Sequence, residues 1–165
     1  MQTKTFIYSK SNQRNIAFLF LGLGAIGAAL ALYMWLWADP ILLSVLVGGI
    51  FLAILGIIIF LKLMFAPKKE NETAITISKE GITATTTPVA KAAGLIEWND
   101  IANINLLTKS LEVTLINPEK YAARMKNFFV RDTFMKSLKG TVRISFMETN
   151  ASYNEIAEIL KKYTN

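Results

Sequence analysis

The sequence predicts a membrane-spanning helical hairpin followed by an α+β domain of antiparallel strands that ends in a C-terminal helix. Residues 16–37 and 41–61 are apolar runs without a charged side chain. Each run is long enough to cross a bilayer core of about 30 Å as a helix. Beyond residue 71, short alternating apolar runs separated by turn residues are typical of strands.

Composition and charge exclude several classes of function. The chain of 165 residues has no His and no Cys, and 18 Lys and Arg residues stand against 12 Asp and Glu residues. Disulfides, imidazole or thiolate metal sites and the common forms of His-based catalysis are therefore excluded. The basic residues gather around the apolar runs, which is typical of membrane flanks, and no nucleic-acid recognition motif is present. We expect no catalysis, no cofactor, no metal and no nucleic-acid partner.

The two apolar runs predict spans over about residues 16–37 and 41–65. Only residues 38–40 separate the two uncharged runs, which predicts a tight antiparallel hairpin. Asp39 is placed to cap the second helix, and Pro40 then falls in its first turn. A cleaved signal peptide is the alternative for the first run, but the length of that run and the second run directly after it favour a span.

Basic residues on both sides of the hairpin predict its orientation. The membrane flanks contain Lys4, Lys10, Arg14, Lys62, Lys68 and Lys69, whereas the connecting turn has only Asp39. Because positive charge marks the cytoplasmic side, we expect a multi-pass protein of the bacterial inner membrane with both termini in the cytoplasm. The expected division is an N-terminal segment and hairpin over residues 1–69 and a cytoplasmic domain over residues 70–165.

Small residues recur at helical spacing along both spans. The pairs are Gly24 with Ala28, Gly27 with Ala31, Ser44 with Gly48, and Gly49 with Ala53 and then Gly56. Small side chains let helices approach closely, and we favour packing of the hairpin on itself. A homodimer and docking to a larger membrane protein are the alternatives. No ionisable residue lies at mid-membrane depth, which favours an anchor over a transport path.

The C-terminal half alternates between strand and turn signals. A strand hairpin is expected over residues 74–78 and 81–87, a loop over 88–94, and further strands over 95–98, 101–107 and 111–116, which together make a five-strand meander. Asn117, Pro118 and Glu119 have the form of a helix start, so a helix or broken helical segment is expected over about 118–138. After Gly140, one more strand precedes a capping box of Ser152 and Glu155 and a last amphipathic helix.

Two motifs resemble those of bacterial pleckstrin-homology-like (PH-like) domains. They are the runs IEWNDI over residues 96–101 and LINPEKY over residues 115–121. With two N-terminal spans, the chain is similar to a family of small bacterial membrane proteins built as a two-helix anchor with a PH-like cytoplasmic domain. The resemblance implies a PH-like antiparallel β-barrel, bent and partly closed, capped by the C-terminal helix. The residues that carry this fold motif are Trp98, Asp100, Asn117, Pro118 and Tyr121.

Glu97 and Asp100 are the candidates for an acid pair, but no partner nucleophile or metal ligand accompanies them. We favour a structural role, in which Trp98 fills the core and Asp100 accepts backbone hydrogen bonds in the following turn.

The segment 118–138 combines basic residues with unusual apolar density. It either packs on the strands, which we favour, or lies against the bilayer, where Phe128, Phe129 and Phe134 would contact lipid or a partner.

The leading hypothesis is a membrane-anchored interaction module that offers an exposed strand edge, or the groove beside its last helix, to another membrane-associated protein. A lipid-responsive component whose segment 118–138 contacts the bilayer is the alternative, and an enzyme is a remote third.

Overall fold

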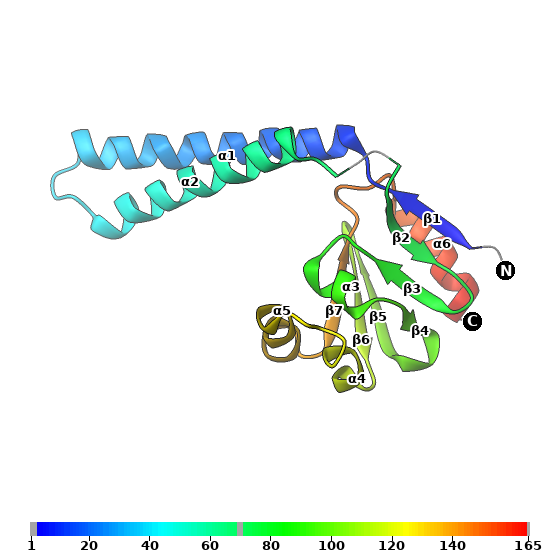
Figure 1. Cartoon of the computed structure of the whole chain (residues 1–165). Coiled ribbons are helices and arrows are strands. Elements are labelled where there is room, and N and C mark those ends of the chain that lie inside the picture. The colour runs from blue at the N-terminus through cyan, green and yellow to red at the C-terminus, as the bar shows by residue number, and fades with distance from the viewer. Residues whose placement is uncertain (1–2, 69–70, 165) are drawn as a thin grey trace. The chain divides into compact units, whose positions relative to one another are not determined.

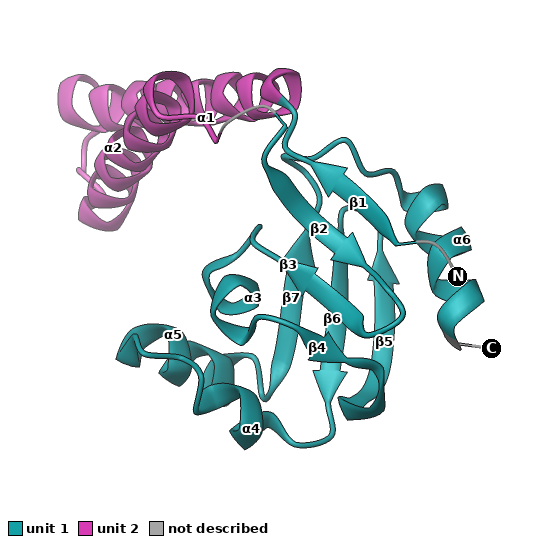
Figure 2. Cartoon of the chain, turned by 45° about the vertical axis from the view of Figure 1, so that its right-hand side comes forward, with its two compact units in different colours: residues 1–9, 70–165 teal, residues 10–69 magenta. Residues whose placement is uncertain are grey.

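The chain forms two compact units. The computed structural model describes residues 3–68 and 71–164. Unit 2 is Lys10–Lys69, and unit 1 combines Met1–Ser9 with Glu70–Asn165 (Figure 2). Residues 3–9, which the sequence analysis grouped with the hairpin, belong to unit 1. The reason is that Lys4–Ile7 is a strand of that unit.

Unit 2 consists of two helices, α1 (Lys10–Leu36) and α2 (Leu43–Phe65), which are long and apolar enough to cross a membrane (Figure 1). The predicted cap of the second helix is wrong. Asp39 and Pro40 lie in the connection, and α2 begins at Leu43 after Leu42, which makes no side-chain capping hydrogen bond. The three apolar residues between Pro40 and the next polar residue, Ser44, give no signal that separates loop from helix.

Glycines set the close approach of the two helices. A Cβ atom placed on Gly27 would lie 2.7 Å from the carbonyl oxygen of Gly49, and one on Gly56 would lie 2.6 Å from the carbonyl oxygen of Phe20. Both distances are shorter than any ordinary carbon contact. Gly48, in contrast, has no atom within 4 Å of such a Cβ. The small residues expected to pack the hairpin on itself therefore do so at Gly24, Gly27, Gly49 and Gly56.

A buried glutamine joins the two ends of the hairpin. Gln13, only 1% exposed, lies in the first turn of α1. Its amide nitrogen donates to the carbonyl oxygen of Lys68 at 3.1 Å, and its amide oxygen accepts from the Lys68 backbone N–H at 2.8 Å. This paired bond mimics a strand ladder and holds the chain that leaves α2 beside the start of α1.

We predict that Gly27→Val separates the two helices, because a branched side chain has no room against the backbone of α2. The Phe18 and Phe60 ring centroids are 6.1 Å apart, and the chain has no native Cys, so cysteines at these two positions report helix proximity. The cross-linking yield should fall several-fold for Gly27→Val and stay unchanged for the matched Gly48→Val. Equal yields for the two variants would contradict the packing described.

Unit 1 contains two antiparallel sheets (Figure 1). The first has the order β1-β2-β3-β4, with β1 (Lys4–Ile7), β2 (Thr73–Ile77), β3 (Gly81–Ala84) and β4 (Ile96–Glu97). The expected strand hairpin is β2 and β3, which pair from Ile75 with Ala84 to Ile77 with Ile82. The strand β1, which the sequence analysis did not predict, pairs with β2 on the side opposite to β3.

The second sheet has the order β5-β6-β7, with β5 (Ile101–Leu107), β6 (Ser110–Leu115) and β7 (Thr141–Ser145). The expected five-strand meander is therefore wrong. β4 pairs only with β3, and a 3-10 turn, η1 (Trp98–Asp100), separates β4 from β5, the first strand of the second sheet. The described residues make two sheets and not a closed barrel.

Short helices fill the connections. The expected loop over residues 88–94 is instead α3 (Pro88–Ala93), capped by Thr87, whose hydroxyl accepts from the Ala90 N–H at 3.1 Å. The segment 118–138 is broken, as α4 (Pro118–Ala122), α5 (Phe128–Asp132) and a π-helical turn, η2 (Thr133–Ser137). Gly140 ends it with a φ of +76°, which a side chain would strain. The last helix is α6 (Tyr153–Thr164), where Ser152 and Glu155 form the predicted capping box.

One hydrophobic core fills unit 1. It joins apolar residues from both sheets with Tyr121, Phe134, Ile156 and Leu160 from the helices. Phe6 and Tyr8, at 2% and 1% exposure, bring the N-terminal strand into the same core. The residues before the hairpin are therefore as much a part of the domain as those after it.

We predict that Phe6→Ala destabilises unit 1 by about 3–5 kcal/mol, because it empties a fully packed core position. Hydrogen exchange of the β2 amides in the full chain should accelerate accordingly. Thr5→Ala, an exposed position on the other face of the same strand, is the matched control and should leave the exchange unchanged. Slow β2 exchange in Phe6→Ala would show that the domain does not need β1.

Candidate functional site

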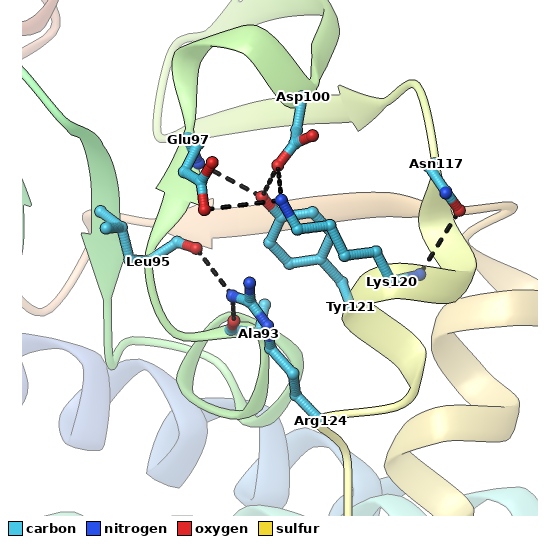
Figure 3. A network of polar contacts seen from close by, with 8 residues as sticks. All are labelled: Ala93, Leu95, Glu97, Asp100, Asn117, Lys120, Tyr121 and Arg124. Atoms are coloured by element: carbon cyan, nitrogen blue, oxygen red, sulfur yellow. Dashed lines mark hydrogen bonds and ion pairs between the residues drawn. The ribbon is translucent and has the colours of Figure 1, made fainter.

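A polar cluster ties α4 to the turn between the two sheets (Figure 3). The Asp100 carboxylate accepts from the Tyr121 hydroxyl at 2.6 Å and from the Lys120 ammonium at 2.7 Å. Asn117 caps α4, because its side-chain oxygen accepts from the Lys120 backbone N–H at 3.4 Å, and Pro118 occupies the first turn. The cap sets the start of α4 and so places Lys120 and Tyr121 against Asp100.

Tyr121 is held from several sides. Its ring is fully buried, and its hydroxyl accepts from the Glu97 backbone N–H at 3.2 Å. The Arg124 guanidinium lies 4.5 Å from the ring centroid and donates to the carbonyl oxygens of Ala93 and Leu95 at 3.0 and 2.9 Å (Figure 3). We call Glu97, Asp100, Lys120, Tyr121 and Arg124 the polar latch, since they fasten α4 to the chain around β4.

The electrostatics of the polar latch favour one fixed set of charges. The hydrogen bond from Lys120, followed by that from Tyr121, lowers the pKa of Asp100, and the same bond to Asp100 raises the pKa of Lys120. Burial, and then the hydrogen bond to Asp100, raises the pKa of Tyr121. Each shift moves the pKa of its group further from neutral pH. The polar latch therefore keeps an ionised Asp100, a charged Lys120 and a neutral Tyr121, as a structural cluster does.

The fold-motif residues come together here, with two corrections. Asp100 binds side chains of α4 rather than the backbone of the following turn. Trp98 packs against the core without filling it: it is half-buried, stacks on Tyr163 of α6 with centroids 5.1 Å apart, and donates from its indole N–H to the Ser78 carbonyl oxygen at 2.9 Å. Among residues 3–68 and 71–164, no cluster of three or more acidic side chains is placed to hold a metal ion.

A groove of about 540 Å³ runs between β5 and α6. Its apolar lining comes from Trp98, Ile101, Ile104, Leu106, Leu160 and Tyr163. The strand β5 stands at the edge of its sheet, with exposed Ala102 and Asn103 at the rim of the groove and Lys161 on the α6 side. An edge strand offers unpaired backbone groups, so this groove combines hydrogen-bonding capacity with an apolar wall.

Two phenylalanines project from α5. Phe128 is 61% exposed and Phe129 is 78% exposed, and their rings meet edge to face with centroids 5.8 Å apart. Phe134, which we grouped with them as a lipid or partner contact, is fully buried in the core and makes no such contact. The expectation for Phe134 is thus corrected, because the π-helical turn η2 directs this side chain inward while Phe128 and Phe129 point outward.

Four of the predicted membrane-flank residues lie near the ends of the two helices. Lys10 and Arg14 are in the first turns of α1, Lys62 is in the last turn of α2, and Lys68 follows it. Lys4 lies on β1, with its ammonium 5.9 Å from the Phe6 ring centroid. Lys69 lies outside the described residues. Gln13, which joins the hairpin ends, carried no sequence signal beyond being a polar residue before an apolar run.

The chain was compared with family models, with curated proteins and with solved structures, and none of them matches.

We predict that Tyr121→Phe destabilises unit 1 by about 1–3 kcal/mol, since it removes the hydroxyl that joins Asp100 to the Glu97 N–H.

Asp100→Asn should change the stability of unit 1 in a pH-dependent way. A lowered pKa gives stability that is present above the ordinary aspartate value and lost as pH falls through the folded value. Thermal denaturation curves of wild type and Asp100→Asn should therefore differ at pH 7 and converge in strong acid. A constant difference at all pH values would contradict the role of the Asp100 charge.

Proposed function

We propose that the chain is a membrane-anchored interaction module without catalysis, whose unit 1 is a PH-like domain at the cytoplasmic face of the inner membrane. The single observation that carries the proposal is the groove between β5 and α6, which lies on an edge strand and has an apolar lining. Two antiparallel sheets followed by a C-terminal helix support the PH-like assignment.

The exposed surface of unit 2 supports membrane anchoring. Phe51, Ile58 and Phe65 are 65%, 57% and 82% exposed, so the hairpin presents large apolar side chains to its surroundings. Water would penalise this surface by about 25 cal/mol for each Å², whereas lipid would not. The basic residues at the hairpin ends favour a cytoplasmic location for both ends.

Strand pairing is an independent reason to place both ends of the hairpin on one side of the membrane. β1 precedes α1, β2 follows α2, and the two strands pair in one sheet. Whichever side of the membrane holds residues 4–7 must therefore also hold residues 73–77. This arrangement requires an even number of crossings, as a two-helix hairpin provides.

The proposed mode of recognition is strand addition. An extended segment of a membrane-associated partner would pair with the free edge of β5 and place its alternate apolar side chains against Leu160 and Tyr163. The ammonium of Lys161 at the rim would complement an acidic side chain. Anchoring both proteins in one membrane raises their effective concentration, so modest affinity per contact is sufficient.

We predict that a photo-cross-linking residue at Asn103, on the rim of the groove, captures a discrete partner in intact cells. Ala157 lines the groove on its α6 side, so the long side chain of Ala157→Arg should block the groove and abolish this product. Glu158→Arg is the matched control, because Glu158 is the next residue of α6 but does not line the groove, and this variant should preserve the product. Cross-linking from exposed Glu119 is the background control. An identical product from Glu119, or no product from Asn103, would reject the groove as the binding site.

A further inference from the structure

The exposed aromatic pair on α5 belongs to a surface that the groove does not include. We call Lys126, Phe128, Phe129 and Arg131 the aromatic tip. We propose that the aromatic tip docks on the anionic surface of the bilayer in which the chain is anchored. The inference rests on the proposed anchoring but not on the proposed partner groove.

The aromatic tip is held in place from both ends. Met125, 3% exposed, and Phe134, fully buried, are core residues on either side of it, and Val130 packs against the same core. Asn127 fixes the first turn of α5, because its side-chain oxygen accepts from the N–H groups of Phe129 and Val130 at 2.9 and 3.3 Å. The phenylalanines therefore project from an ordered turn, and docking them costs little conformational entropy.

The apolar part of the aromatic tip is contiguous. The Phe128 and Phe129 rings touch edge to face and are both more than half exposed. Single exposed apolar residues are ordinary, but two adjoining phenylalanines on an ordered projection leave a patch that water disfavours. A projecting pair suits insertion into a soft headgroup layer, whereas the concave groove suits a peptide.

The charges around this pair favour an anionic surface. Lys126 and Arg131 are exposed, and no ion pair engages either of them in the part of the chain that the structure describes. The nearest acidic residue in the sequence, Asp132, is neutralised by Lys136 at 2.7 Å. The neighbouring helix α3, which contacts α5, adds the exposed Lys91. Aromatic residues beside unpaired cations form the usual composition of an interfacial lipid contact.

The test uses the full chain in lipid nanodiscs. Because the chain has no Cys, an environment-sensitive fluorophore can be placed on Phe129→Cys, which leaves Phe128 and both cations in place. Quenching by spin-labelled lipids is compared between phosphatidylcholine and mixed phosphatidylcholine–phosphatidylglycerol discs. The matched control is Ile116→Cys, because Ile116 is an apolar residue that is 64% exposed and lies outside the aromatic tip. Phe51→Cys, in α2, reports anchoring itself.

We expect strong quenching at Phe129→Cys in the anionic discs and weak quenching at Ile116→Cys. Adding Lys126→Gln or Arg131→Gln should lower the docking equilibrium constant about fivefold for each cation removed. If Phe51→Cys is quenched but Phe129→Cys remains open to aqueous iodide, the inference is overturned and anchoring stands. If Phe129→Cys is shielded from iodide but not quenched by lipid, a protein surface or second copy covers it, which also overturns the inference. If Phe51→Cys is not quenched, anchoring itself fails.

Discussion

Pairing of β1 with β2 is the constraint on which the rest of the structure depends, since these strands lie on opposite sides of the hairpin in the sequence. β1 supplies Phe6 to the core, and Tyr8, directly after the strand, is also a core residue. The chain after β1 also pairs with the segment before α6, where the Ser9 N–H donates to the Glu148 carbonyl at 2.8 Å and the Asn150 N–H to the Ile7 carbonyl at 3.0 Å. The hairpin is therefore an insertion within one domain, and that domain can be completed only after both helices of the hairpin have been synthesised.

Contacts made by the chain just after β1 also help to position the groove. Pairing of residues 7–9 with 148–150 fixes where α6 begins, and Trp98 stacked on Tyr163 fixes where it ends. Trp98 itself lies in the turn that the polar latch fastens to α4 through Asp100. The two walls of the groove are thus set by contacts from the two termini of unit 1 and from its middle, rather than by β5 and α6 alone.

The sequence predicted the features that periodicity and caps encode, such as both long apolar helices, the β2–β3 hairpin and the Ser152–Glu155 capping box. It missed what depends on distant partners. Residues 4–7 become a strand only because β2 offers an edge, and residues 88–93 form a helix too short to show a period, although Thr87, Pro88 and Gly94 are ordinary helix boundaries. Composition likewise grouped Phe134 with Phe128 and Phe129, because burial depends on the π-helical turn and not on residue type.

The groove and the aromatic tip place different demands on a tethered domain. On the proposed anchoring, a partner segment in the groove would have to reach the membrane surface itself, whereas the bilayer would always be within reach of a domain joined to both ends of the hairpin. Such tethering would supply the encounter at no cost in translational entropy, so the proposed contact of two aromatic rings and two cations would have a measurable effect on orientation. Contact of the aromatic tip with lipid would restrict how the domain turns above the membrane. The direction in which the groove faces would then be set before any partner arrives.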